Sequence, residues 1–368
     1  MKIKGFRHLC LLLMMFTIFD CQSQHEEDMS LEERVEGLLK EYPGLSIAVG
    51  LGKDLVYEKG FGFADVAAGL NVRPIHQFRY YSLSKSITGM ALVKLIEEGK
   101  LDIEKPISFY LDQLPEAYNN VKVKQLINHS AGVRHYNRGE WEEISKDHCD
   151  LTAEAIATFI NDPLESKPGE KYEYSSFGYV LLSHLIATVS EQPYEQYLEE
   201  ALFAPLGLEN IHIDRSPEIE HEVAYYSSWN QKKAKGKLAR EVNNTCKYGG
   251  GALVGTAADL VRLHLAFINQ EVVGQTLTRQ YYSAIPISAD ERGNAAFGIG
   301  DAQTDSGLRY HFHSGAALGA NGALLVYEPH AERKEPLVVV VLGNLKDDKM
   351  NSEMSAIANY FIKASTRQ

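Results

Sequence analysis

Strand patterns occupy the two ends of this chain and are missing from its middle. Alternating or fully apolar runs of strand length occur before about residue 100 and after about residue 243. Between them the apolar residues recur at helical spacing, over residues 123–128, 152–161, 177–190 and 194–203. We therefore predict an α/β (α+β) protein in which a mainly helical subdomain, residues 101–243, is inserted between two sheet-forming parts, residues 31–100 and 244–366.

The sheet-forming parts contain several well-marked elements. Two apolar runs, Leu45–Gly50 and Leu55–Tyr57, flank a turn and predict a hairpin. The run Val338–Val341 is apolar on both faces, which predicts a central strand covered by helices on both sides. Further strands are expected at residues 297–299, 310–313 and 323–327. Further helices are expected at residues 31–42 and 350–362. Another helix should begin at residue 257, with Leu260, Leu263 and Phe267 facing inward.

The first 23 residues have the pattern of a signal peptide. Basic residues precede an unbroken apolar run, Leu9–Phe19, that is too short to span a bilayer. Cys21 follows where the cysteine of a bacterial lipoprotein would lie, and cleavage after Ser23 is the other processing route. We expect an exported protein of the periplasm or cell envelope, anchored in the membrane if Cys21 is lipidated, with residues 24–30 as a tether.

Composition and charge exclude several function classes. The chain has 368 residues, 45% hydrophobic and 23% charged, which suits one large or two closely joined globular domains. Its formal net charge of -12 argues against nucleic acid as a partner, and a lysine-rich stretch at residues 232–240 is interpreted as a solvated loop. Gly249–Gly251 predicts a close backbone approach and lacks the spacing of a phosphate-binding loop.

Cysteines are sparse outside the predicted leader. Only Cys149 and Cys246 lie in the body of the chain, too few for a disulfide framework and without the spacing of a zinc site. Whether these two residues pair is left open by the sequence.

Ser82 and Lys85 form a Ser-x-x-Lys pair at the start of a helical pattern over residues 82–98. If Ser82 opens that helix, Lys85 lies one turn on and its ammonium reaches back to the hydroxyl. A serine is a poor nucleophile until a base takes its proton, and a lysine is such a base only where burial or a positive neighbour lowers its pKa. Ser82 would serve equally well as a helix N-cap, so the pair indicates catalysis only if other parts of the chain supply further catalytic motifs.

Two later segments add titratable side chains. Tyr174 ends a loop just before the helix at residue 177, and a nearby lysine would favour its phenolate. His311 and His313 share one face of a predicted strand, but Gly315 stands where metal-dependent hydrolases usually add an aspartate. We therefore expect no metal and no other cofactor. Taken singly, Tyr174 is more typical of packing and His313 of a structural residue.

The order of these motifs resembles a known superfamily. Ser82-x-x-Lys85, Tyr174-Ser175-Ser176 and His313-Ser314-Gly315 are similar to the three motifs of the serine beta-lactamases and penicillin-binding proteins. The connecting stretches resemble the class C-like branch and, within it, the group of the mitochondrial serine beta-lactamase-like protein of animals and its bacterial relatives. These stretches are residues 126–136, 161–179, 249–260 and 313–320. The resemblance covers roughly residues 31 to 365.

The resemblance implies a beta-lactamase/transpeptidase-like fold: an antiparallel sheet made from both chain ends, flanked by helices, with the active site where it meets the helical subdomain. Ser82 would be acylated, and Lys85 and Tyr174 would pass its proton to the leaving group. His313 would help to keep Tyr174 ionised or bind a substrate carboxylate. The remaining implied site consists of the oxyanion-hole amides of Ser82 and Ala316 and the substrate-binding residues Ser176, Ser314 and Gly315.

Two positions depart from the superfamily's pattern. Ser176 stands where an asparagine commonly grips the substrate's acylamido group, and serine is too short to reach as far. His313 stands where lysine is common, which weakens the positive charge at neutral pH. Both changes disfavour efficient beta-lactam hydrolysis and leave peptide or ester hydrolysis open.

The resulting expectation is an exported serine hydrolase with a covalent acyl-enzyme at Ser82, acting as a peptidase or esterase on a small-molecule or peptide substrate. The alternatives are a D-amino-acid peptidase, a carboxypeptidase or a beta-lactamase on cell-wall-like substrates. A catalytically quiet scaffold or filament-forming protein on the same fold is the alternative of another class.

Overall fold

The computed structural model describes residues 29–137, 139–140, 144, 146–215, 220–288, 293–304, 307–331, 333–347 and 349–365. The predicted leader, its Cys21 and all but the last two residues of the tether lie outside these ranges, so export and lipid anchoring stay predictions. Ser30 caps the first described helix. Within the described ranges, no helix has the length and apolar character needed to cross a bilayer.

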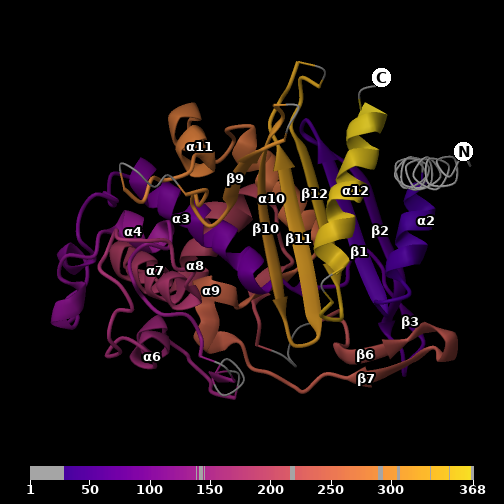
Figure 1. The fold of residues 1–368 in the computed structure, drawn as a ribbon, viewed down its shortest axis with the longest axis horizontal. Coiled ribbons are helices and arrows are strands. Elements are labelled where there is room, and N and C mark those ends of the chain that lie inside the picture. The colour runs from indigo at the N-terminus through magenta and orange to yellow at the C-terminus, as the bar shows by residue number, and fades with distance from the viewer. Residues whose placement is uncertain are drawn as a thin grey trace, which may run out of the picture.

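One antiparallel sheet of seven strands is built from both ends of the chain (Figure 1). Its order is β3-β2-β1-β12-β11-β10-β9. The strands are β1 (Gly44–Leu51), β2 (Asp54–Asp65), β3 (Leu70–Asn71), β9 (Gly300–Gln303), β10 (Arg309–Ala317), β11 (Ala320–Tyr327) and β12 (Leu337–Gly343). Since β12 pairs with β1, the C-terminal strands complete a sheet that the N-terminal hairpin begins.

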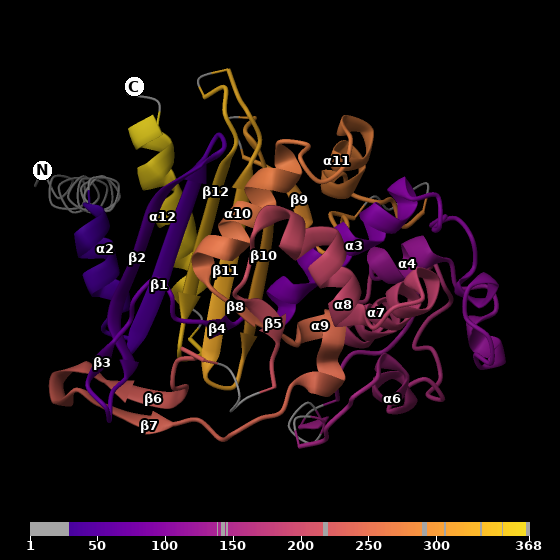
Figure 2. The ribbon, with the colours of Figure 1, turned by 180° about the vertical axis from the view of Figure 1, so that it is seen from behind.

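The predicted central strand is confirmed. Val338 and Val340 of β12 belong to the main hydrophobic core, whereas Val339 and Val341 point to a second core on the opposite face. On the main-core face lies α10 (Ala257–Ile268), and on the other lie α2 (Leu31–Leu38) and α12 (Lys349–Ser365), as Figure 2 also shows. An all-apolar strand therefore forms here because both of its faces are covered.

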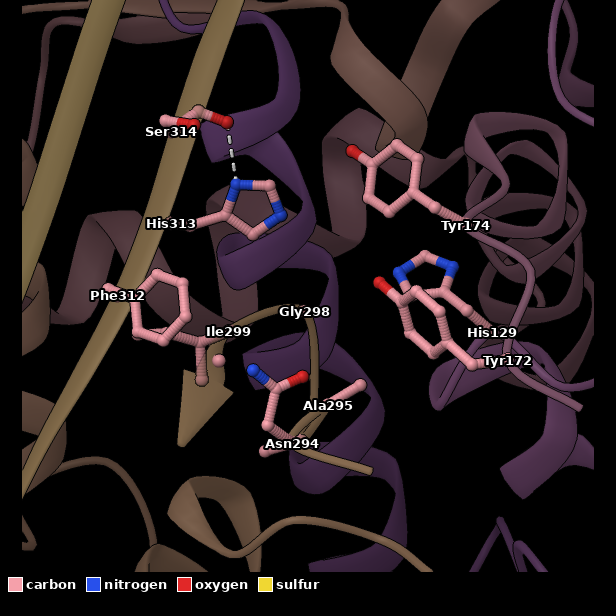
Figure 3. Close-up of a pocket in the computed structure, with 12 residues that line it drawn as sticks. His129, Tyr172, Tyr174, Asn294, Ala295, Gly298, Ile299, Phe312, His313 and Ser314 are labelled. Atoms are coloured by element: carbon pink, nitrogen blue, oxygen red, sulfur yellow. Dashed lines mark hydrogen bonds between the residues drawn. The ribbon is translucent and has the colours of Figure 1, made fainter. Parts of the chain in front are cut away.

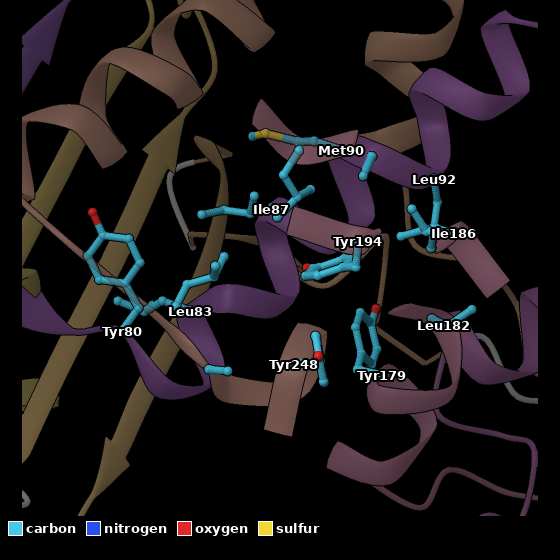
Figure 4. Close-up of a cluster of buried hydrophobic side chains, with 14 of the residues drawn as sticks. Tyr80, Leu83, Ile87, Met90, Leu92, Tyr179, Leu182, Ile186, Tyr194 and Tyr248 are labelled. Carbon is cyan, nitrogen blue, oxygen red and sulfur yellow. The ribbon is translucent and has the colours of Figure 1, made fainter. Parts of the chain in front are cut away.

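Helices beside the sheet make the other part of the molecule (Figures 1 and 2). They are α3 (Ser84–Glu97), α4 (Val123–Ile127), α6 (Thr152–Ala157), α7 (Ser176–Ser190), α8 (Tyr194–Leu198), α9 (Tyr248–Gly251) and α11 (Gln275–Tyr282). Leu83 and Ile87 near the start of α3 pack with Tyr179 and Leu182 of α7 and with Tyr248 in one core cluster, which Figure 4 shows. This packing fixes the start of α3 against the helical part.

The expectation that strands are absent between residues 101 and 243 is wrong. Three short strands lie there: β5 (Ile211–Ile213), β6 (Tyr226–Asn230) and β7 (Lys235–Leu238). The strand β5 joins a small sheet with β4 (Phe78–Arg79) and β8 (Leu253–Gly255), and β6 and β7 form a hairpin. The lysine-rich stretch is therefore not a plain loop, because its lysines sit exposed on that hairpin. Strands of three to five residues are too short to show a period.

Other differences concern element ends. The second strand continues past Tyr57 to Asp65, and its pairing with β1 extends to Gly62. The strand expected at residues 297–299 begins only at Gly300. Cys149 and Cys246 form a disulfide, which the sequence left open. The disulfide attaches the segment before α6 to the turn Thr245–Lys247, which leads into α9.

Candidate active site

Ser82 lies in a tight 3-10 turn, Tyr81–Leu83, and α3 begins only at Ser84. The prediction that Ser82 itself opens the α-helix is thus off by two residues. The residue before it, Tyr81, has a φ of 46°, a strained conformation for a non-glycine residue. Gly315 of β10 lies directly against this turn, since a Cβ there would overlap the carbonyl oxygen of Tyr80. The sheet edge therefore fixes the turn that presents Ser82.

Lys85 is fully buried beneath Ser82. Its Nζ donates hydrogen bonds to Ser82 Oγ at 3.2 Å, Ser176 Oγ at 2.9 Å and the Gly250 carbonyl at 2.6 Å. Burial lowers the pKa of this ammonium, while the neighbouring Tyr174 acts in the opposite direction. A lysine of lowered pKa beside a serine hydroxyl is suited to receive its proton.

Tyr174 approaches Ser82 from the loop before α7. Its hydroxyl donates to Ser82 Oγ at 2.9 Å, and Lys85 Nζ lies 5.1 Å from the centre of its ring. Burial alone would raise the pKa of the phenol, but the charge of Lys85 and hydrogen bonds with Lys85, Ser82 and Ser176 outweigh it, so the pKa is lowered. Ser82 and Lys85, which are neighbours in sequence, thus share one hydrogen-bond network with Tyr174, 92 residues after Ser82.

Two histidines hold the Tyr174 segment in place. His129 Nδ1 accepts from the backbone N–H of Ser175 at 3.2 Å, and His135 Nδ1 accepts from that of Ser176 at 3.1 Å. A histidine nitrogen accepts only when it carries no proton, so both rings must be neutral. Burial and the charge of Lys85 lower the pKa of His135 to about 4, and burial lowers that of His129 well below its usual value.

His313 faces Tyr174 across the cleft (Figure 3), with 6.4 Å between ring centres. Its Nδ1 donates to the Ser314 carbonyl at 2.7 Å, and burial together with Lys85 lowers its pKa to about 4. Its ring is therefore neutral at pH 7, and Lys85 supplies the positive charge beside Tyr174. The adjoining His311 is buried and bonds Glu328 at 3.0 Å. Among the described residues no group of three or more potential metal ligands occurs.

Two pockets are lined by residues of the three motifs. One, of about 200 Å³, lies on the side of Tyr174, His313 and Ser314 and is also lined by Tyr172 and Asn294 (Figure 3). The other, of about 230 Å³, contains Ser82 itself. Its lining also includes Ser176, His135, Lys247, Ala316 and Lys346. The predicted oxyanion-hole residues, Ser82 and Ala316, thus line the same pocket.

The structure brings Ser82, Lys85, Tyr174, Ser176 and the 313–316 segment together at one junction between sheet and helices. Sequence reasoning missed Lys247 and did not assign roles to His129 and His135. The available signal for Lys247 was a lysine directly before the glycine-rich helix α9. The two histidines accept hydrogen bonds from backbone N–H groups, and such contacts leave no pattern in a sequence.

Acidification is expected to destabilise the fold between about pH 6.5 and pH 4. The unfolded chain takes up protons on its histidines near pH 6.5, but folded His135 and His313 do so only near pH 4, so the unfolded state binds more protons in this window. Stability is complete above the window and is lost as the pH falls through it. The urea midpoint should therefore be lower at pH 5.0 than at pH 7.5.

A matched variant identifies the source of this loss. Asparagine at residue 135 keeps an acceptor near the position of Nδ1 but does not titrate, so His135→Asn should show a smaller drop in midpoint than the wild type. A wild-type midpoint that is equal or higher at pH 5.0 would contradict the neutral-histidine account.

A buried lysine and a tyrosine on one serine hydroxyl define the class of active-site serine hydrolases to which penicillin-binding proteins belong. The chain belongs to the Beta-lactamase family, whose model matches residues 31–359. It is 26% identical to the mitochondrial serine beta-lactamase-like protein LACTB of Mus musculus, over 87% of this chain and 77% of that protein.

Solved structures agree on the fold. The octameric penicillin-binding protein homologue from Pyrococcus abyssi superposes with a TM-score of 0.72 at 23% identity, covering 91% of this chain and 77% of that one. The D-amino acid amidase from Ochrobactrum anthropi SV3, solved with L-phenylalanine amide, gives a TM-score of 0.72 at 20% identity over 91% and 97% of the two chains. At these identities the likeness establishes the fold alone.

Proposed function

We propose that this protein is a serine hydrolase that forms a covalent acyl-enzyme at Ser82 and cleaves ester or amide bonds, as an esterase or peptidase. The observation that carries the proposal is the double hydrogen bond on Ser82 Oγ, from Lys85 at 3.2 Å and from Tyr174 at 2.9 Å, with the pKa values of both partners lowered. A purely structural serine needs neither a buried ammonium nor a second titratable partner.

Acylation follows from these contacts. In the reactive state one proton is missing from the Lys85–Tyr174 pair, so the pair accepts the Ser82 proton while Oγ attacks the substrate carbonyl carbon. The new Oγ–C bond forms, the bond to the leaving group breaks, and Tyr174 passes the proton to the leaving oxygen or nitrogen. Backbone amides of Ser82 and Ala316 would stabilise the oxyanion. Water then attacks the acyl-enzyme and regenerates Ser82.

The substrate orientation follows from the position of Tyr174. Since Tyr174 protonates the leaving group, that group lies in the pocket beside Tyr174, His313 and Ser314, and the acyl group lies in the pocket with Ser176 and Ala316. The leaving-group pocket is lined by neutral histidines, and no lysine or arginine is among its described lining residues. This favours uncharged leaving groups over the free carboxylate that a carboxypeptidase must recognise.

Ser176 supports the same preference for ester and peptide substrates. Its side chain is 2% exposed, and its hydroxyl accepts from Lys85 at 2.9 Å. It therefore helps to hold Lys85 and does not reach toward an acylamido group as an asparagine would. Peptidase or esterase activity ranks above beta-lactam hydrolysis on this ground.

A partitioning experiment tests the covalent intermediate. Two esters with one acyl group and different leaving groups, 4-nitrophenol and phenol, are hydrolysed in the presence of hydroxylamine. Because both pass through the same acyl-enzyme, the ratio of hydroxamate to free acid is expected to be identical for the two esters. A ratio that depends on the leaving group would mean direct attack by water and would overturn the proposal. No enzymatic hydrolysis of either ester would favour the scaffold alternative.

A further inference from the structure

The pocket assigned to the acyl group is lined by two lysines. Lys247 lies in its wall, 4% exposed, and Lys346, just after β12, is exposed and also contributes to the lining. No aspartate or glutamate is among the described residues that line this pocket. His135 also lines this pocket, but its ring is neutral because its Nδ1 accepts a backbone hydrogen bond. Positive charge in this pocket therefore comes from lysine alone.

Lys247 is held at a fixed place near the nucleophile. Its Nζ donates to Asn244 Oδ1 at 2.7 Å and lies 5.8 Å from the centre of the ring of Tyr81, the residue next to Ser82. Asn244 in turn bonds the carboxylate of Asp214, which pairs with Arg79 at 2.7 Å. A lysine fixed by a buried network loses little side-chain entropy when it binds a ligand, which makes it a better anion site than a mobile surface lysine.

The network also allows a purely structural explanation for the position of Lys247. Asp214 and Glu222 lie near Arg79, so the ammonium of Lys247 would help to balance their two negative charges. Asp214, however, already has its own partner in Arg79, and a counter-ion role does not explain why Lys247 also lines the pocket beside Ser82. The two roles predict different kinetic behaviour and are separable by experiment.

We propose that Lys247, assisted at the pocket mouth by Lys346, binds a carboxylate on the acyl part of the substrate, so that the enzyme prefers acyl groups with an anionic end. This inference rests on the proposed acyl-enzyme at Ser82 and adds the class of acyl group. The reaction itself is unchanged: the carboxylate stays intact, while the carbonyl at the other end of the acyl group is transferred to Ser82 Oγ and then to water.

Two esters that differ by one charge test the proposal. In 4-nitrophenyl hydrogen adipate the acyl group ends in a carboxylate, and in 4-nitrophenyl methyl adipate that carboxylate is capped. A charge-assisted hydrogen bond of about 1.5–3 kcal/mol corresponds to roughly 10- to 150-fold. The wild-type kcat/KM at pH 6.5 should therefore be at least about tenfold higher for the charged ester.

The variant Lys247→Met, which keeps side-chain length and removes the charge, should bring the ratio of the two kcat/KM values most of the way toward one, with Lys346 accounting for the remainder. Lys232→Met, on the exposed turn of the β6–β7 hairpin, is the matched control and should keep the wild-type ratio. A purely structural Lys247 would lower both rates together and leave the ratio unchanged, so an unchanged ratio overturns the proposal.

If Lys247→Met fails to fold, the pH dependence of the same ratio in the wild type still tests the proposal. Burial, opposed by Asp214 and reinforced by Arg79, lowers the pKa of Lys247 to about 7. Of the other groups around it, Arg79 stays charged, Tyr81 has a pKa raised by burial to about 12 and His135 one of about 4. The preference for the charged ester should therefore fall between pH 6 and pH 8.5, and the ratio cancels changes in the shared catalytic steps. A ratio that is constant with pH, or near one throughout, overturns the proposal.

Different results would contradict the acyl-enzyme at Ser82 and the carboxylate site at Lys247. If Ser82→Ala still hydrolyses both esters, the acyl-enzyme proposal fails. If hydrolysis depends on Ser82 but the two esters react equally well, only the assignment of Lys247 fails.

Discussion

Ser82→Ala should lower kcat/KM for an activated ester by roughly 10⁴-fold or more, because it removes the oxygen that forms the acyl bond. Both Lys85 and Tyr174 contact Ser82 Oγ through hydrogen bonds. Alanine removes only this oxygen, so the pockets and the network of the histidines should persist. Initial rates with 4-nitrophenyl hexanoate, corrected for spontaneous hydrolysis, measure the effect.

The control for this variant is Ser190→Ala, at the last residue of α7 and outside both pockets of the candidate site. It should keep the wild-type rate. A Ser82→Ala protein that retains even a tenth of the wild-type rate would show that another group carries the hydrolysis, and the proposed mechanism would be abandoned.

Lys85→Met is expected to lower kcat/KM by about 10²- to 10⁴-fold, the usual contribution of a general base. Methionine fills the same buried volume but accepts no proton, and without the nearby ammonium the pKa of Tyr174 returns toward that of a buried phenol. The pH at which activity reaches half its plateau should therefore rise, which a loss of packing alone would not produce. Stopped assays from pH 6 to pH 10 follow both effects.

Lys94→Met, about two and a half turns further along α3, is the matched control. Its Nζ pairs with Glu97 at the protein surface and takes no part in the cleft, so its rate and pH profile should match those of the wild type. Circular dichroism of both variants checks that the fold is kept. A Lys85→Met enzyme with an unchanged pH profile would remove Lys85 from the proton network.

Much of the fold was predictable because long elements carry strong periodicity. The double-sided apolar run of β12 predicted a central strand, and the helical spacing predicted α7 to within a residue and the start of α10. The strand β5 was not predictable because its partner β8 is distant in sequence, and β6 and β7 form a hairpin of strands too short to show a period. The pairing of β1 with β12, across nearly three hundred residues, was expected only from family resemblance.

The candidate site was predictable in its residue types but not in its electrostatics. The three motifs identified Ser82, Lys85, Tyr174 and His313 as neighbours. The state of His313 depends on burial and on its bond to the Ser314 carbonyl, and neither is visible in the sequence. Lys247 escaped notice because its place in the acyl pocket is set by the fold around Asn244 and Tyr81.

The most direct measurement is the intact mass of the protein after incubation with a fluorophosphonate, on the wild type and on Ser82→Ala, followed by peptide mapping. The account predicts one adduct on the wild type, located at Ser82, and none on the variant. No adduct on the wild type, or an equal adduct on both proteins, would contradict the claim that Ser82 is an activated nucleophile.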